Sequence, residues 1–179
     1  RGIGKDNKIP WPRLKKDMVF FSKLTTASLL SNNNAVIMGR KTWESLPESK
    51  KPLKDRYNIV LTKNGEYPLP TFEAITTFGH EPKQAYKCDD LEKALTLLDQ
   101  SPFIESVFVI GGTSIYEEAF ARFPDRCMNV YVTEIDQEYD CDRYFPNFDT
   151  DAYKLQTKPS ITEHDIRYRF LRYKRKTPK

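Results

Sequence analysis

The sequence predicts an α/β fold in which a central, mostly parallel mixed sheet of about eight strands is flanked by helices and ends in an antiparallel C-terminal strand. Two observations predict this class. Short apolar runs rich in β-branched residues, typical of buried strands, alternate with longer segments of helical periodicity. The last segment, "IRYRFLRYK", instead alternates apolar and basic residues, so that Ile166, Tyr168 and Phe170 share one face of a half-buried strand.

The elements can be placed in order along the chain. We expect helices at residues 14–26, 40–47, 89–100 and 113–123, and strands at residues 34–39, 56–62, 71–77, 106–112, 129–135 and 166–174. Pro47 stops the second helix, and an aspartate begins the third. The run "SVFVIGG" reads as the most strongly buried strand of the set. No repeat or linker interrupts the pattern, so residues 1–179 are expected to form one domain.

Composition narrows the class of protein. The chain has 179 residues, 39% of them hydrophobic, and a net charge of +4. No run approaches the roughly 20 apolar residues of a membrane helix, so we expect no membrane partner. The mild basic excess favours an anionic ligand without requiring nucleic acid. The basic and aromatic tail "RYRFLRYKRK" is better explained as a half-buried strand with a charged outer face than as a nucleic-acid surface.

Cysteine and histidine usage favours a reducing compartment and no metal. Cys88, Cys127 and Cys141 are odd in number and widely spaced, which matches neither a disulfide framework nor a zinc site. His80 and His164 stand alone, without ligand spacing around them. We therefore expect a cytoplasmic protein.

One carboxylate lies in an unusual place. On a helical wheel of "WPRLKKDMVFFSKLT", Asp17 falls in the same sector as the apolar Leu14, Phe21 and Leu24. Burying an ionised carboxylate without a partner costs several kcal/mol, on the order of an unpaired buried charge. Asp17 therefore either reaches water or a lysine at a helix end, or faces an apolar cleft that receives a cationic or hydrogen-bond-donating ligand.

Two strand-to-helix junctions form candidate ligand contacts. In "VIMGRKTW" a strand ends at Gly39, and Arg40, Lys41 and Thr42 open a helix, which suits an anion. In "FVIGGTSIY" the paired glycines allow a close approach of the backbone to a ligand, although this is not the GxGxxG fingerprint. Two such junctions in one sheet suit a dinucleotide pyrophosphate lying across the strand ends.

Together these segments resemble dihydrofolate reductase of the eukaryotic type. The resemblance is carried by "GIGKDNKIPW", "LKKDMVFF", "AVIMGRKTWESLP", "PLKDRYNIVLT", "FVIGGTSIY", "VYVTEID" and "CDRYFP", in the family's order and approximate spacing from Gly2 to about Phe145, and "IRYRFLRYKR" fits the family's last strand. The family's first strand would precede Arg1, and we expect it to exist in the natural protein.

The resemblance implies reduction of dihydrofolate, with a hydride passing from NADPH to C6 and a proton reaching N5. The implied catalytic residues are Asp17, Trp11 and Thr133. Asp17 orients the pterin through its ring N3 and 2-amino group, and Thr133 bonds both partners. Trp11 holds an ordered water, and water is the immediate proton donor. Antifolates such as methotrexate are the implied inhibitors, and a monomer is the implied state.

The resemblance also assigns binding residues. For the substrate they are Asp17, Met18, Phe21, Leu46, Pro47, Lys50, Leu53, Arg56, Ile110 and Thr133. For NADPH they are Gly2, Ile3, Gly4, Lys5, Asp6, Asn7, Lys8, Arg40, Lys41, Thr42, Thr62, Lys63, Asn64, Ile110, Gly111, Gly112, Thr113, Ser114, Ile115 and Tyr116. Besides the missing first strand, this sequence departs from the family at side chains of both sites: Met18 replaces a common aromatic, Lys63 lies where relatives often have arginine, and the acidic Asp89 lies near the place of a second arginine. Lys63, Arg40 or Lys87 must then compensate at the 2′-phosphate.

Three alternatives remain open on the sequence. The first is a reductase of the same fold that acts on a pyrimidine intermediate of riboflavin synthesis. The second is an inactive relative that only binds a partner. The third is the reductase half of a chain fused to thymidylate synthase.

Overall fold

A computed structural model describes residues 1–30, 33–72 and 84–177. The chain divides into two compact units. The first unit comprises residues 1–18 and 117–179, and the second comprises residues 19–116. Each unit is described by itself below.

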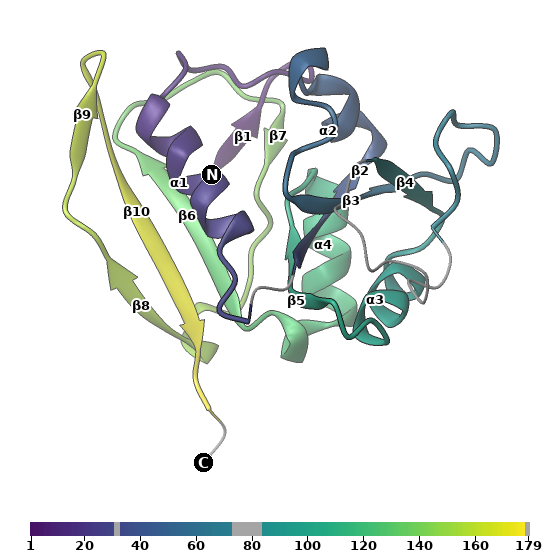
Figure 1. Cartoon of the computed structure of the whole chain (residues 1–179). Coiled ribbons are helices and arrows are strands. Elements are labelled where there is room, and N and C mark those ends of the chain that lie inside the picture. Colours follow the sequence, from purple (N-terminus) through teal and green to yellow (C-terminus); the bar gives the residue numbers. More distant parts are fainter. Residues whose placement is uncertain (31–32, 73–83, 178–179) are drawn as a thin grey trace. The chain divides into compact units, whose positions relative to one another are not determined.

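The second unit is built on a four-stranded parallel sheet with the order β4-β3-β2-β5 (Figure 1). Its strands are β2 (Asn33–Gly39), β3 (Arg56–Leu61), β4 (Ala85–Cys88) and β5 (Ile104–Val109). Its helical elements are α2 (Arg40–Ser45), the 3-10 turn η1 (Glu48–Lys50) and α3 (Leu91–Asp99). Helices α1 (Lys15–Thr26) and α4 (Thr113–Arg122) each have residues in both units.

The core of the second unit lies in β2 and β3, which are buried almost throughout. Val36, Ile37 and Ile59 are fully buried, as expected of central parallel strands covered on both faces. Strand β5 differs from its expectation as the most buried strand, because all its residues are only half-buried. The reason is its position: among the described residues β5 pairs with β2 alone, so it is an edge strand.

Local contacts explain where α3 begins and where α2 ends. The side chain of Asp90 accepts hydrogen bonds from the backbone N–H groups of Glu92 and Lys93 and so caps α3. Helix α2 ends at Ser45, because Leu46 adopts the extended conformation that a following proline imposes. The expected strand at 71–77 falls mostly outside the described residues. Sequence analysis missed β4, which is only four residues long.

The first unit contains an antiparallel sheet of order β6-β10-β8, with β9 also paired to β10. Its strands are β6 (Asn129–Ile135), β8 (Tyr153–Thr157), β9 (Ile161–Glu163) and β10 (Ile166–Arg175). A separate antiparallel pair joins β1 (Gly2–Gly4) to β7 (Arg143–Tyr144), and 3-10 turns lie at η3 (Pro124–Arg126) and η4 (Thr150–Ala152). Within the described residues the strands therefore form three sheets, not the single sheet expected.

The apolar side chains that alternate along β10 are buried in the first unit, as the sequence predicts. Ile166, Tyr168 and Phe170 are buried, and the residues between them are exposed. The turn from β9 to β10 places His164 and Asp165 at φ of 53° and 60°, the geometry of a tight two-residue hairpin. The α/β class, the parallel sheet with its helices and the antiparallel C-terminal strand are confirmed. Sequence analysis missed β8 and β9, both short.

Candidate active site

Asp17 lies on α1 in the first unit, half-buried, beside β6. The hydroxyl of Thr133 donates a hydrogen bond of 2.6 Å to its Oδ1. Burial raises the pKa of the Asp17 carboxyl, the hydrogen bond from Thr133 lowers it, and the charge of Glu163 raises it again, with a net upward shift. In the described part of the chain Asp17 bonds a neutral hydroxyl and no lysine, which favours the ligand-facing interpretation.

A tertiary contact fixes the start of α1. The two carboxylate oxygens of Glu163, on β9, accept hydrogen bonds from the backbone N–H groups of Lys15 and Lys16, the latter at 3.2 Å. A carboxylate at a helix N-terminus satisfies free N–H groups and complements the helix dipole. The hydroxyl of Tyr168 donates to the same carboxylate at 3.1 Å. Sequence analysis missed Glu163, since no local pattern signals a cap supplied 148 positions away.

The N-terminal loop at residues 2–8 is ordered by a tight turn. Lys5 and Lys8 exchange two backbone hydrogen bonds of 2.9 and 2.8 Å across Asp6 and Asn7, which have φ of 49° and 59°. Aspartate and asparagine tolerate this conformation well. The ammonium of Lys5 pairs with Asp140 at 3.0 Å.

Trp11 packs against the segment that follows β6. Its ring meets Tyr139 edge-on, with centroids 5.8 Å apart. The expected catalytic residues Asp17 and Thr133 thus form a direct pair, whereas Trp11 contacts Tyr139 in the same unit.

The two glycine junctions lie in one sheet, as expected, and the structure makes them neighbours because β2 pairs with β5. The backbone N–H of Gly39 donates to the carbonyl oxygen of Gly111 at 2.7 Å, and Gly111 has φ of 113°. A Cβ on Gly112 would lie 3.5 Å from the Thr42 hydroxyl, and one on Gly39 would lie 3.4 Å from Ile115. The Gly111–Gly112 peptide bond is cis. At both junctions the position of a Cβ is therefore approached by atoms of this unit itself, which shows that the two turns pack closely at one end of the sheet.

Tyr116 packs beneath this turn. A Cβ on Gly111 would meet its hydroxyl at 3.3 Å. Burial raises the pKa of Tyr116 to about 12, so the phenol stays neutral at physiological pH. The residues Thr113 and Ser114 begin α4 directly after the paired glycines.

The cationic side chains expected to bind phosphate differ in their partners and in their exposure to solvent. Arg40 pairs with Glu44 at 2.9 Å, which offsets its charge. The ammonium of Lys87 is bonded to the carbonyl oxygens of Tyr67, at 3.0 Å, and Gly65. Lys41 and Lys63 are exposed. Of the three cations expected to compensate for Asp89, Lys63 is therefore the best placed to bind an external anion.

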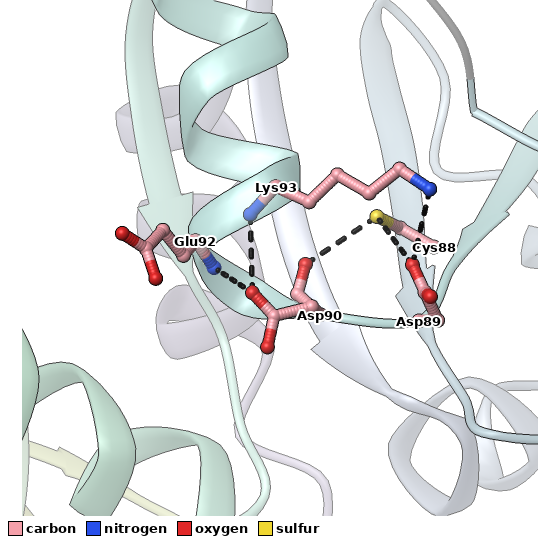
Figure 2. A network of polar contacts seen from close by, with 5 residues as sticks. All are labelled: Cys88, Asp89, Asp90, Glu92 and Lys93. Carbon is pink, nitrogen blue, oxygen red and sulfur yellow. Dashed lines mark hydrogen bonds and ion pairs between the residues drawn. The ribbon is translucent and has the colours of Figure 1, made fainter.

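The carboxyl ends of β3 and β4 also lie together. The backbone N–H of Thr62 donates to the carbonyl oxygen of Cys88 at 2.9 Å, and the hydroxyl of Thr62 accepts from the N–H of Asn64 at 3.2 Å. Next to this contact, Lys93 pairs with Asp89 at 3.3 Å, as Figure 2 shows. The pKa of Asp89 lies below its usual range because its own backbone amide, then Lys93 and then Lys63 stabilise the ionised form.

The neighbouring Cys88 is structural. Its thiol lies 3.3 Å from the carbonyl oxygen of Asp90, and burial raises its pKa (Figure 2). An inert, protonated thiol is the expected result. The thiols of Cys88, Cys127 and Cys141 are free.

Arg56 begins β3 at the other end of the parallel sheet from Gly39. It is 5% exposed and donates to Thr25 Oγ1 at 2.6 Å and to the carbonyl oxygen of Lys54 at 2.9 Å. Its guanidinium lies over the ring of Phe21, 5.8 Å from the centroid. Burial lowers the pKa of Arg56. These two hydrogen bonds leave donors of the guanidinium for a carboxylate ligand.

The remaining expected substrate residues are spread over both units. Leu46, Leu53 and Ile110 pack, partly buried, on the core cluster around Trp43 in the second unit. Pro47 and Lys50 are exposed there. Met18, in the first unit, is 38% exposed.

A hollow of about 570 Å³ lies on the second unit. It is lined by Trp43, Glu44, Glu48, Lys51, Pro52, Tyr67, Leu69, Pro70, Gln84 and Ala85. None of them belongs to the expected sets. The hollow is wide open, whereas a ligand site buries most of its ligand, so it gives no reason to move the candidate site.

Two features are absent from the described residues. No helix in the described ranges is both long and apolar enough to cross a bilayer. The same ranges hold no group of three or more histidine, cysteine, aspartate or glutamate side chains arranged to bind a metal.

Comparison with known proteins identifies the family. The family model for dihydrofolate reductase matches residues 1–175. Among curated proteins, dihydrofolate reductase of Schistosoma mansoni is 40% identical over 96% of this chain and 89% of its own length. The rat enzyme is 37% identical over 98% of this chain and 91% of its own length.

A second group of relatives is longer. A bifunctional dihydrofolate reductase-thymidylate synthase of Arabidopsis thaliana is 41% identical over 97% of this chain, which spans about a third (32%) of the relative's length. The bifunctional protein of Daucus carota matches in the same way, at 41% identity and 31% of its length. Both groups share the reductase segment over almost all of this sequence. Because the family model covers residues 1–175 and the shorter relatives match over almost their whole length, the chain belongs to the dihydrofolate reductase family.

Proposed function

We propose that this chain reduces 7,8-dihydrofolate to 5,6,7,8-tetrahydrofolate with NADPH. The observation that carries the proposal is the half-buried Asp17 carboxylate held by the Thr133 hydroxyl, in a member of this family. A water-poor setting strengthens hydrogen bonds to such a carboxylate. Membership of the family also implies a small-molecule substrate and a nucleotide cofactor.

Asp17 orients the substrate. A flat heterocycle with a ring N–H next to an amino group presents two parallel donors, and the two oxygens of one carboxylate accept both. Because Thr133 already donates to Oδ1, the carboxylate is fixed in rotation before the substrate arrives. Asp17 therefore aligns the pterin and favours positive charge on it, while the proton for N5 comes from water.

The second unit supplies the groups that fit the cofactor. We assign the junctions at Gly39, Gly111 and Gly112 to the cofactor because they lie together at the carboxyl end of the sheet, and Thr42 offers a hydroxyl beside Gly112. When bound, the cofactor supplies the hydride to C6. Lys63 is the residue we assign to the 2′-phosphate that distinguishes NADPH from NADH.

Arg56 is assigned to the carboxylate of the substrate's glutamate tail. Its guanidinium is buried and held by Thr25 and Lys54, so it keeps one orientation. A planar guanidinium binds a carboxylate through two parallel hydrogen bonds.

The decisive experiment measures NADPH oxidation by the purified chain. We expect oxidation that requires dihydrofolate, is much slower with NADH and is inhibited by methotrexate. An Asp17→Asn variant that stays folded serves as the control and is expected to lose most of the turnover. Folded protein that oxidises no NADPH with dihydrofolate would overturn the proposal.

The same assay separates the alternatives. A reductase of pyrimidine intermediates would oxidise NADPH with such a substrate and not with dihydrofolate, and a binding protein would oxidise none. The bifunctional relatives make a second candidate, in which this sequence is the reductase part of a longer chain that also carries thymidylate synthase. The mass of the protein isolated from its source distinguishes a short from a fused chain.

We further propose that residues 1–179 act as one reductase domain, in the cytoplasm and as a monomer. The single family model over residues 1–175 supports the first point. Light scattering on the active protein tests the last, and a dimer mass would contradict it.

A further inference from the structure

We infer that Glu163 is a positioning residue for the proposed reduction: its carboxylate fixes the first turn of α1 so that Asp17 faces Thr133, and its charge acts on the Asp17 carboxyl. The inference rests on the proposed function. It concerns a residue outside both expected binding sets. Its evidence lies wholly within the first unit.

The geometric part comes from the helix N-terminus. Glu163 accepts from the N–H groups of Lys15 and Lys16, the two residues that precede Asp17. The side chain of Glu163 is only 13% exposed, although the two N–H donors belong to exposed residues. Because the helix is rigid over one turn, fixing these N–H groups also fixes the direction of the next side chain.

Thr133 and Glu163, which both contact α1, lie on one face of the antiparallel sheet. Strand β10 pairs Tyr168 with Ile135 and Phe170 with Thr133, so these four side chains share one face of the sheet. Tyr168, fully buried, donates its hydroxyl to Glu163. Thr133, on β6, and Glu163, on β9, are therefore both held by pairing with β10, and one contacts the Asp17 side chain while the other contacts the backbone before it.

The effect of the Glu163 charge on Asp17 depends on which of these two carboxyl groups ionises at the lower pH. Burial opposes ionisation of Glu163, but the N–H groups of Lys15 and Lys16, then Tyr168 and His164, outweigh it, so the pKa of Glu163 lies below its usual range. The pKa of Asp17 lies above its usual range. Glu163 is thus already charged when Asp17 titrates, and like charge disfavours the ionised form of Asp17.

The other groups around Asp17 do not cancel this effect. Thr133, from β6, is neutral, and Tyr168, from β10, has a pKa raised to about 12 and is neutral too. His164, next to Glu163 on the hairpin, lies 4.0 Å from its carboxylate and is 58% exposed. On α1 itself, Lys15 and Lys16 are exposed, so water screens their ammonium groups.

This arrangement has a consequence for the reaction. Asp17 accepts the two pterin donors as a carboxylate, so kcat/KM rises with pH as Asp17 ionises. By raising the pH at which Asp17 ionises, the charge of Glu163 sets the acidic limit of the active range.

The test compares Glu163→Gln and Glu163→Ala with the parent protein. The Asp17 carboxyl is titrated by NMR in carbon-labelled protein without ligands, and kcat/KM for dihydrofolate is measured against pH. For Glu163→Gln, which keeps an acceptor but loses the charge, we expect both midpoints to move to lower pH with KM nearly unchanged. For Glu163→Ala we expect the same move, and a KM increase of roughly threefold to tenfold, the size of a lost helix cap.

Glu134→Gln is the matched control. Glu134 neighbours Thr133 on β6, points to the opposite face and pairs with Arg169 at 2.5 Å. The same loss of charge there is expected to leave the Asp17 midpoint unchanged. Circular dichroism and thermal unfolding confirm that each variant folds.

An Asp17 titration in Glu163→Gln that superimposes on that of the parent overturns the inference, whatever the activity. An equal shift in Glu134→Gln also overturns it, because the effect would then be one of net charge. If the parent reduces no dihydrofolate, the proposed function fails, while the ligand-free titration still decides whether Glu163 acts on Asp17.

Discussion

The hydroxyl of Thr133 donates a 2.6 Å hydrogen bond to Oδ1 of Asp17 although 116 positions separate the two residues. Each carboxylate oxygen has two lone pairs, so Oδ1 is held by Thr133 while both oxygens can still accept from a ligand. The contact brings together a helix and a strand that the sequence places far apart. It is the geometric basis for assigning substrate orientation to Asp17.

Asp17→Asn is expected to lower turnover by roughly a hundredfold or more, the scale seen when one preorganised electrostatic group is removed. The amide keeps the shape and an acceptor for Thr133, so the fold should persist. Steady-state NADPH oxidation and circular dichroism check the two statements. Turnover within a factor of about three of the parent would contradict the role of Asp17.

Asp17→Asn is also expected to change how the stability of the protein depends on pH. Burial raises the pKa of Asp17 in the folded state, so the folded protein binds this proton more tightly than the unfolded chain. Its contribution to stability is then complete at low pH and is lost as pH rises from the unfolded carboxyl value through the folded value. In thermal unfolding, Asp17→Asn should be at least as stable as the parent at neutral pH, with no such advantage in acid.

Thr133→Val removes the hydrogen bond that favours the ionised carboxylate. Since that bond lowers the pKa of Asp17, its loss should move the titration midpoint to higher pH. This is the opposite direction from Glu163→Gln. The two variants measured together by NMR provide a sign test, and a shift of both in the same direction would refute the electrostatic account of the site.

Arg56→Lys keeps the charge but loses the planar pair of donors. We expect KM for dihydrofolate to rise roughly tenfold. Losing the contacts with Thr25 and Lys54 should also cost about 1–3 kcal/mol of unfolding free energy. A dihydropterin substrate without the glutamate tail is the control, because its KM should not change. An equal change of KM for both substrates would show that Arg56 does not bind the glutamate tail.

Lys63→Ala should raise KM for NADPH roughly tenfold and leave KM for NADH unchanged, because NADH lacks the 2′-phosphate. Asp89→Asn should act in the opposite direction, lowering KM for NADPH by roughly twofold to fivefold, since its carboxylate offsets the charge of Lys63. Initial rates with both cofactors measure this. Equal effects on NADPH and NADH would rule out a 2′-phosphate role.

Gly111→Ala tests the junction between β5 and α4. With φ of 113° and Tyr116 3.3 Å from the position of the new Cβ, the substitution should cost about 1–3 kcal/mol. Gly65→Ala is the control: no atom lies within 4 Å of its Cβ position, and its cost should stay within about 0.5 kcal/mol. Denaturant unfolding compares the two, and equal costs would show that the glycine at 111 is not required by its conformation.

Much of the second unit could be predicted from the sequence. Strands β2 and β3 read as continuous apolar runs because buried parallel strands have apolar side chains on both faces. The rule that parallel strands end at one edge placed Gly39 and Gly111 at the same end of the sheet, and the pairing of β2 with β5 made them neighbours. The exposure of β5 could not be predicted, because an edge strand and a central strand have the same local pattern.

The sequence by itself determined the class of fold, the family and the identities of Asp17, Arg56 and the paired glycines, because periodicity, turn chemistry and motif order are local properties of the chain. Only the tertiary structure decided that Glu163 caps α1, that Lys87 is bound to carbonyl oxygens and that Lys63 is left for an anion. Such partners lie tens of positions apart or more. Which charge meets which depends on strand pairing and burial, and no short stretch of sequence encodes either.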